Sequence, residues 1–189
     1  MKNIANFLFE TGMLKRTPRS GLQFLGSGDE SVAEHSFRVV MIAYTLAKLD
    51  GQVDENRVQK MALFHDMLET RTGDLNYVNK KYLKVDEEKA AKEVAKDLPF
   101  GQELKDLLKE FREKKTREAL IVNDADQLEL ILMLKEYGDL GNKYTKDWIA
   151  FALRRLNTSL AKEIAEAVLS TDSTDWWFTG KDDWWVWGK

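Results

Sequence analysis

The stretch LFHDMLETRTGDL, residues 63–75, places His65 and Asp66 side by side within an apolar helical pattern, with Glu69 and Asp74 close behind. Proteins rarely bury carboxylates unless positive charge or hydrogen-bond donors meet them. On one continuous helix, Glu69 would stand four residues after His65 and three after Asp66, on the same face one turn later. This spacing suits a metal site, a salt-bridge network or contact with open water.

The chain contains two histidines, His35 and His65, and each lies near carboxylates in a segment that is predicted to be helical. A further acidic pair, Asp124 and Asp126, lies in the most apolar segment, VNDADQLEL. Divalent transition-metal ions bind neutral imidazole nitrogen together with carboxylate oxygen. Buried ion pairs also place acids inside helices, so spacing alone favours a metal site and a salt-bridge network about equally.

The elements that must position these residues read as consecutive helices. Apolar residues at helical spacing, interrupted by glycine- and proline-containing stretches, predict helices over 2–12, 31–49, 55–71, 86–97, 101–115, 117–137 and 145–169. Between the first two, LKRTPRSGLQFLGSGDES is predicted to be a loop. The segment 117–137 is apolar almost all round, which places it at the centre of a bundle. No period-two strand pattern or repeat occurs, so we predict an all-α, single-domain helical bundle.

Composition restricts the class of protein further. A chain of 189 residues with 43% hydrophobic and 32% charged residues is typical of one soluble domain. A net charge of −3 argues against non-specific nucleic-acid binding, and the absence of cysteine excludes disulfide and thiolate chemistry. The sequence contains no stretch of about 18 apolar residues, so no membrane span is predicted. The first ten residues do not resemble a secretory signal, so a cytoplasmic location is predicted.

The C-terminal segment differs from the rest in composition. We predict a helical bundle over residues 1–170 and a tail over 171–189, in which TDWWFTGKDDWWVWGK holds five of the six tryptophans. Exposed aromatic surface promotes association, so the tail is predicted to pack on the bundle or at a subunit interface. Stacking of a tryptophan on a substrate ring is the alternative.

The ordered motifs EHSFRV, FHD, ETRTGD and NDADQLE resemble the HD-domain metal-dependent phosphohydrolases, and in particular their compact 5′-deoxynucleotidase-like group. The resemblance extends from LKRTPRSG to about residue 137. It implies one divalent ion, Mn or Co with Mg or Zn as alternatives, held by His35, His65, Asp66 and Asp126. Helical phase leaves Asp124 open as the last ligand, whereas the motif favours Asp126 because it precedes the LE pair by two residues.

The resemblance also implies roles for residues around the ion. Glu69 and Asp74 would lie beside the attacking water, orient it and handle its proton. Arg19, in KRTPRSG, would bind the phosphate through its planar guanidinium. Asn76 and Tyr77 are candidate substrate contacts, matched by position.

The function implied is hydrolysis of (deoxy)nucleoside 5′-monophosphates to nucleoside and phosphate by a homodimer. One alternative is a nucleoside triphosphate or pyrophosphate hydrolase on the same scaffold, for which Lys80, Lys81 and Lys84 would supply positive charge. A second alternative is a non-enzymatic helical interaction protein, in which the acids and histidines form structural pairs. A dinuclear oxygenase centre is disfavoured because it would need more than two histidines.

Overall fold

The structure, a computed structural model, describes residues 1–178 and 184–188, and this part of the chain is built from helices without a β-strand. An isolated antiparallel bridge joins Pro18 to Ser31, both within the segment predicted to be a loop. That segment also contains one helical turn, α2, Leu22–Leu25. The prediction of an all-α, single-domain helical bundle is confirmed.

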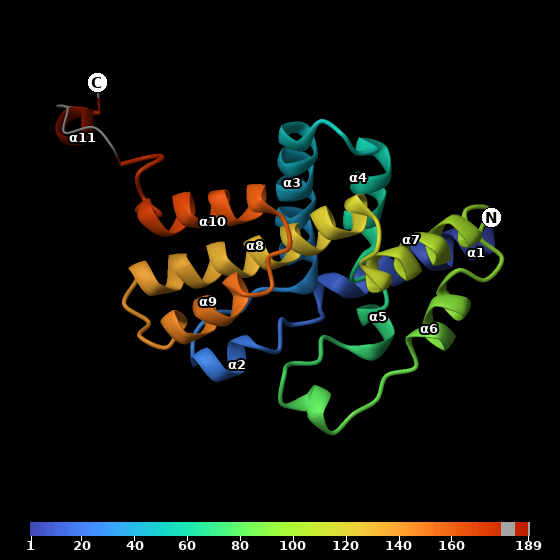
Figure 1. The fold of residues 1–189 in the computed structure, drawn as a ribbon. Helices are drawn as coiled ribbons and strands as arrows, with labels where there is room; N and C mark the ends of the chain where they lie inside the picture. Colours follow the sequence, from blue (N-terminus) through green and yellow to red (C-terminus); the bar gives the residue numbers. More distant parts are fainter. Residues whose placement is uncertain (179–183, 189) are drawn as a thin grey trace.

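The central helix of the bundle is α8, Arg117–Asp139, which crosses the middle of the fold in Figure 1. Helices α3, Val32–Asp50, and α4, Glu55–Phe64, pack against it, and α10, Ser159–Ser170, lies along it. These four helices supply most of the largest apolar core of the described residues. The all-round apolar character of α8 follows from this position, since its neighbours cover it on several sides.

Two smaller cores complete the bundle. Helices α1, Lys2–Thr11, α6, Glu87–Val94, and α7, Gly101–Glu113, enclose one of them. The other lies between α2, α8 and α9, Thr145–Leu153, and its members include Leu22, Met133 and, partly buried, Trp148. The short 3-10 turns Gly12–Lys15 and Asn79–Lys81 connect elements near the surface.

The start of α3 is fixed by a capping box. Ser31 Oγ accepts the backbone N–H of Glu34, while the Glu34 carboxylate accepts the backbone N–H of Ser31 at 2.7 Å. Such reciprocal bonds satisfy two amide groups that a helix start leaves unpaired. They also fix the register of His35, which lies one residue beyond the box and is buried.

The prediction of one continuous helix over 55–71 is wrong. Helix α4 ends at Phe64, and the one-turn helix α5 spans Glu69–Thr72. Between them the amides of Met67 and Glu69 donate to carbonyls three residues earlier, at 2.9 and 3.0 Å. These bonds tighten the turn. The tightened turn lets Met67 enter the second core while His65, two residues earlier, faces the opposite way toward α3.

The prediction of one helix over 145–169 is also wrong, because the chain breaks between α9 and α10. The buried Asp124 carboxylate accepts the backbone N–H of Asn157 at 2.7 Å and that of Thr158 at 2.9 Å, together with both side chains. Thr158 in turn caps α10. A carboxylate 33 residues upstream therefore fixes this break.

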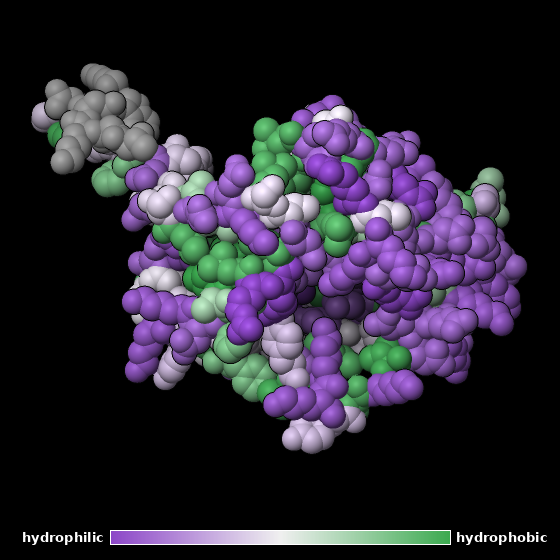
Figure 2. Space-filling view, viewed as in Figure 1, coloured by the Kyte–Doolittle hydropathy of each residue, from purple (hydrophilic) through white to green (hydrophobic). Residues whose placement is uncertain are grey.

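The aromatic tail extends beyond the end of α10 in Figure 1, with α11 spanning Trp184–Trp187. The rings of Trp177, Phe178 and Trp185 contact one another, with centroids 5.1 to 5.7 Å apart, and all three side chains are exposed. Packing of the tail on a bundle or subunit interface stays a prediction, and residues 179–183 and 189 lie outside the described part. Figure 2 shows a largely hydrophilic face with smaller apolar patches. None of the described helices is long and apolar enough to span a membrane.

Candidate active site

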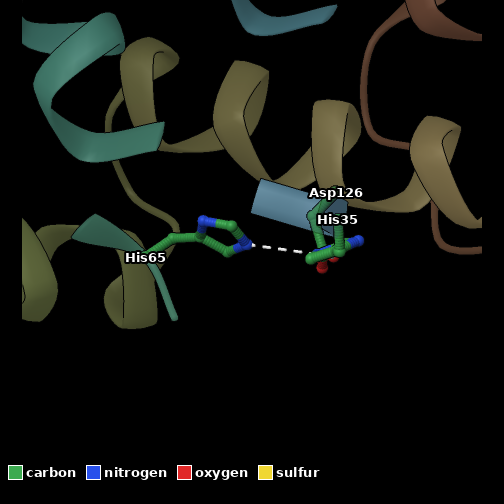
Figure 3. A group of neighbouring side chains, drawn as sticks. All are labelled: His35, His65 and Asp126. Carbon is green, nitrogen blue, oxygen red and sulfur yellow. Dashed lines mark hydrogen bonds and ion pairs between the residues drawn. The ribbon is translucent and has the colours of Figure 1, made fainter. Parts of the chain in front are cut away.

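Three side chains from three elements converge in the interior, as Figure 3 shows. His35 comes from α3, His65 from the tight turn after α4, and Asp126 from α8. The Nε2 atom of His35 lies 3.3 Å from Nε2 of His65 and 3.3 Å from Oδ1 of Asp126. The three residues each offer a ligand atom, and these atoms lie within 4.8 Å of one another.

Asp66 adds a fourth group from the tight turn. Its Oδ2 atom lies 3.4 Å from Nε2 of His35 and 3.2 Å from Nε2 of His65. This oxygen is buried and has no hydrogen-bond partner among the described residues. A buried carboxylate oxygen without a hydrogen-bond donor is costly, and the nearest Arg19 nitrogen, Nη1, is 3.9 Å away, so a cation bound between this oxygen and the two imidazoles would stabilise it.

The spacing of these atoms fits a metal ion. Nitrogen and oxygen ligands about 2.0–2.2 Å from one ion lie about 3.0–3.5 Å apart in octahedral or tetrahedral geometry. The contacts between the imidazole and carboxylate atoms, 3.2 to 3.4 Å, fall in this range. The mixture of imidazole and carboxylate groups suits a divalent transition metal. These residues therefore form a candidate metal-binding cluster.

The outer nitrogen of each imidazole is held by a second partner. His65 Nδ1 lies 2.8 Å from the carbonyl oxygen of Ala62, and His35 Nδ1 lies 2.6 Å from Oε2 of Glu129. A carbonyl can only accept, so Nδ1 of His65 carries hydrogen and its Nε2 faces the cluster. Glu129 is fully buried and also accepts from Arg38, at 2.8 and 3.0 Å. Such partners orient the rings of metal-binding histidines.

Two side chains at the cluster, Glu69 and His35, have raised pKa values. Burial raises the pKa of Glu69 to about 9, and the Asp66 and Asp74 carboxylates add to the rise. Burial and the Arg19 guanidinium oppose protonation of His35, yet hydrogen bonds with Asp126 and Glu129 raise its pKa to about 10. The carboxylates that favour a proton on His35 also favour a metal cation bound to the imidazole in place of that proton.

One pocket adjoins the cluster and contains the residues predicted to act on substrate. Its polar lining consists of Arg19, Asp66, Glu69, Asp74, Asn76, Tyr77, Lys80, Asp126 and Gln127. Its remaining lining consists of Gly21, Leu22, Leu75, Leu130, Met133 and Trp148. Several of these apolar side chains belong to the small core between α2, α8 and α9. The pocket therefore joins a charged wall to an apolar one.

The loop carrying Arg19 is fixed to the segment that follows α5. The backbone N–H of Ser20 donates to Oδ2 of Asp74 at 2.7 Å, and that of Arg19 donates to the carbonyl of Glu30 at 2.9 Å. The Arg19 side chain is mostly buried, with Nη1 3.9 Å from Oδ2 of Asp66. Asp74 thus holds the arginine loop against the cluster.

The other two predicted substrate contacts line the pocket with their side chains already engaged. Oδ1 of Asn76 accepts two backbone N–H groups of the following turn, at 3.0 and 3.1 Å. The Tyr77 hydroxyl contacts Arg155, whose guanidinium lies 5.0 Å from the ring centroid. Arg155 also donates to Gln127 at 2.9 Å, which joins this side of the pocket to α8.

Comparison with known proteins places the chain in a family. The sequence profile of the HD domain matches residues 11–168, most of the chain. This protein belongs to the HD-domain family. The predicted resemblance to the HD-domain metal-dependent phosphohydrolases is thereby confirmed.

Relatives of this HD-domain protein include named enzymes. It is 35% identical to 5′-deoxynucleotidase HDDC2 of Bos taurus over 148 residues, which cover 75% of this chain and 71% of the relative. It is 32% identical to 5′-deoxynucleotidase VV1113 of Vibrio vulnificus, over 70% of this chain and 73% of that one.

Solved structures with the same fold include proteins from Pyrococcus furiosus and Magnetospirillum magnetotacticum. A conserved hypothetical protein of Pyrococcus furiosus is 33% identical, with a TM-score of 0.74 over 87% of this chain and 98% of its own. A protein of Magnetospirillum magnetotacticum described as a predicted metal-dependent phosphohydrolase is 26% identical, with a TM-score of 0.70 over 89% and 90%.

Within this HD-domain fold, several residues that sequence reasoning missed contact the site. Glu129 contacts His35, Arg38 donates to Glu129, and Trp148 and Gln127 line the pocket. Glu129 had a usable signal, since it is an acid three residues after Asp126 in the most apolar helix. Trp148 had none, because an aromatic residue in an amphipathic helix is usually part of a core.

Proposed function

We propose that this protein is a metal-dependent 5′-nucleotidase that hydrolyses (deoxy)nucleoside 5′-monophosphates to nucleoside and inorganic phosphate. The observation that supports it is one pocket in which Asp66 and Asp126 of the histidine–carboxylate cluster lie together with the buried Arg19 and with Glu69, whose Oε2 has no partner among the described residues. The names of the 5′-deoxynucleotidase relatives support the same reaction. They also favour an enzyme over the non-enzymatic alternative.

The metal would be held by His35, His65, Asp66 and Asp126. Asp124 is the weaker choice because both of its oxygens accept hydrogen bonds from Asn157 and Thr158. Two imidazole nitrogens favour Mn or Co over Mg, which prefers oxygen ligands, and Zn is an alternative. When bound, the ion supplies charge neutralisation and polarisation of the phosphoryl group.

The protein side chains would divide the remaining work. The Arg19 guanidinium binds the phosphate oxygens and stabilises the charge that develops on them. Glu69 orients the attacking water and takes its proton, since its Oε2 is buried and has no partner among the described residues. Asp74 holds the Arg19 loop by accepting the backbone N–H of Ser20. It also lines the pocket, where it can donate a proton to the leaving 5′ oxygen.

A second pocket favours the triphosphate or pyrophosphate alternative. It shares Asp66, Glu69 and Asp126 with the first and is lined by the cations Lys80, Lys84, Arg112 and Lys114. Additional phosphates would meet positive charge there. The product distinguishes the two reactions, because a monophosphatase releases orthophosphate whereas this alternative releases pyrophosphate or triphosphate.

The proposed activity is tested with chelated protein and a panel of nucleoside mono-, di- and triphosphates, with Mn, Co or Mg added back. We expect orthophosphate release that requires metal and is confined to monophosphates. Pyrophosphate or triphosphate release would favour the alternative with the same cluster. A folded sample that is inactive toward the whole panel would contradict the proposed activity.

The Glu129→Gln variant tests whether the buried carboxylate supports metal binding through His35. The amide keeps the shape but removes the charge that the imidazole and Arg38 both contact. We expect the dissociation constant for Co²⁺, measured by calorimetric titration, to rise about 10- to 100-fold. Glu136→Gln is the matched control because Glu136 accepts from Arg38 at 2.7 Å, whereas the carboxylate that contacts Nδ1 of His35 is that of Glu129. If Glu129→Gln bound Co²⁺ as tightly as Glu136→Gln does, Glu129 would not support metal binding through His35.

We also propose that the enzyme is a cytoplasmic homodimer with no nucleic-acid or membrane partner. The exposed rings of the tail offer apolar surface for pairing. Sedimentation of the full chain at micromolar concentration checks this, and a monomer would contradict it.

A further inference from the structure

The apolar wall of the active-site pocket contains a tryptophan that no prediction placed there. Trp148, from α9, lines the same pocket as Arg19 and Asp126. Its ring packs beside Leu22 and Met133 in the small core, which fixes one part of the side chain. The ring is only half-buried, so another part of it faces the pocket.

The indole also lies close to the arginine loop. A Cβ placed on Gly21 would stand 3.6 Å from the Trp148 ring, so the ring is in near contact with that residue. Gly21 follows Arg19 by two residues, and their Cα atoms are at most about 7.6 Å apart. A ligand whose phosphate is bound by Arg19 would therefore extend past Gly21 to reach the indole.

Trp148 is available for stacking in a way that Tyr77 is not. The Tyr77 ring is covered by the Arg155 guanidinium. Trp148, by contrast, contacts the apolar residues of the small core, and among the described residues no cation lies over its ring. A flat aromatic face beside an arginine loop is suited to a flat heteroaromatic group carried on a phosphate.

We propose that Trp148 is a specificity-determining residue that stacks on the nucleobase while Arg19 binds the phosphate. The inference rests on the proposed nucleotidase function and names the part of the substrate that the apolar wall binds. Because stacking uses the face of a base and not its edge, this contact accepts purines and pyrimidines alike. It would distinguish nucleotides from phosphomonoesters that lack a base.

The test compares a deoxynucleoside 5′-monophosphate with deoxyribose 5-phosphate, which lacks the base. We expect Trp148→Ala to lower kcat/KM for the nucleotide about tenfold or more, mainly through KM, and for the sugar phosphate by less than about twofold. Trp148→Phe restores most of the loss because it keeps an aromatic face. Phe151→Ala is the matched control, since Phe151 is an exposed aromatic of the same helix outside the pocket lining.

Equal losses for both substrates would overturn the proposal, because they would indicate a structural role. An unchanged nucleotide KM in Trp148→Ala would overturn it as well. If the protein hydrolyses no monophosphate, the proposed function fails separately. Equilibrium dialysis of a labelled deoxynucleoside monophosphate then still tests Trp148, with about tenfold weaker binding expected in Trp148→Ala and unchanged binding contradicting the stacking.

Discussion

Replacement of Asp66 by Asn is expected to lower kcat/KM for phosphate release about 10³-fold or more, while the protein stays folded and helical. The Oδ2 atom of Asp66 lies within 3.4 Å of Nε2 of both histidines and is buried. An amide at this place carries no charge and would turn a donor toward the cluster or vacate the position. Loss of a bound ion removes several kcal/mol of charge stabilisation, and each 1.36 kcal/mol or so is tenfold in rate.

The measurement pairs phosphate release with metal content after dialysis, and circular dichroism checks the helices. We expect Asp66→Asn to lose both metal and activity. Asp175→Asn is the control, because Asp175 is an exposed aspartate outside the pocket lining. Near-normal hydrolysis by Asp66→Asn would show that the metal assignment is wrong.

Replacement of Glu69 by Gln is expected to lower kcat by about 10²- to 10⁴-fold while metal content is unchanged. Glu69 lines the pocket beside Asp66 but belongs to α5, after the tight turn, and its Oε2 is buried without a partner among the described residues. Burial raises the pKa of Glu69 to about 9, and positive charge brought into the cluster favours the ionised form that can accept a proton. Glutamine cannot accept that proton.

Single-turnover phosphate release and metal content are measured on the same preparation. The matched control is Glu166→Gln, an exposed glutamate on α10. A kcat within about threefold of the unaltered protein would mean that another group takes the proton, and Asp74 would be the next candidate. Asp66→Asn and Glu69→Gln together separate metal binding from proton transfer, because only the first should lose the ion.

Most helices could be predicted because their signals are local. The capping box at Ser31 and Glu34 marks the start of α3, and the all-round apolar pattern marks α8 as the central helix. Helix propensity and capping act within a few residues, so a single sequence records them. The order of the four motifs likewise indicated the family, and the structure brings the residues of those motifs into one interior cluster.

The breaks in two predicted helices could not be predicted, because their causes are not local. Asn157 and Thr158 leave the helical path to donate to Asp124, which belongs to another helix. His65 turns toward α3 while Met67 enters a different core. The position of Trp148 in the pocket could not be predicted for the same reason, since it depends on contacts between residues far apart in the chain.

The convergence of three chain segments on one point also affects the stability of the folded protein. His35 and His65 are 30 residues apart in the chain, and Asp126 belongs to a third element. An unfolded chain does not hold these groups together, so an ion that they bind acts as a removable cross-link of the native state. At a free concentration 100 times its dissociation constant, such an ion adds about 2.7 kcal/mol to the free energy of unfolding. In a chain of this length that corresponds to about 5–11 °C in melting temperature, so metal supply would set the amount of folded enzyme as well as its rate.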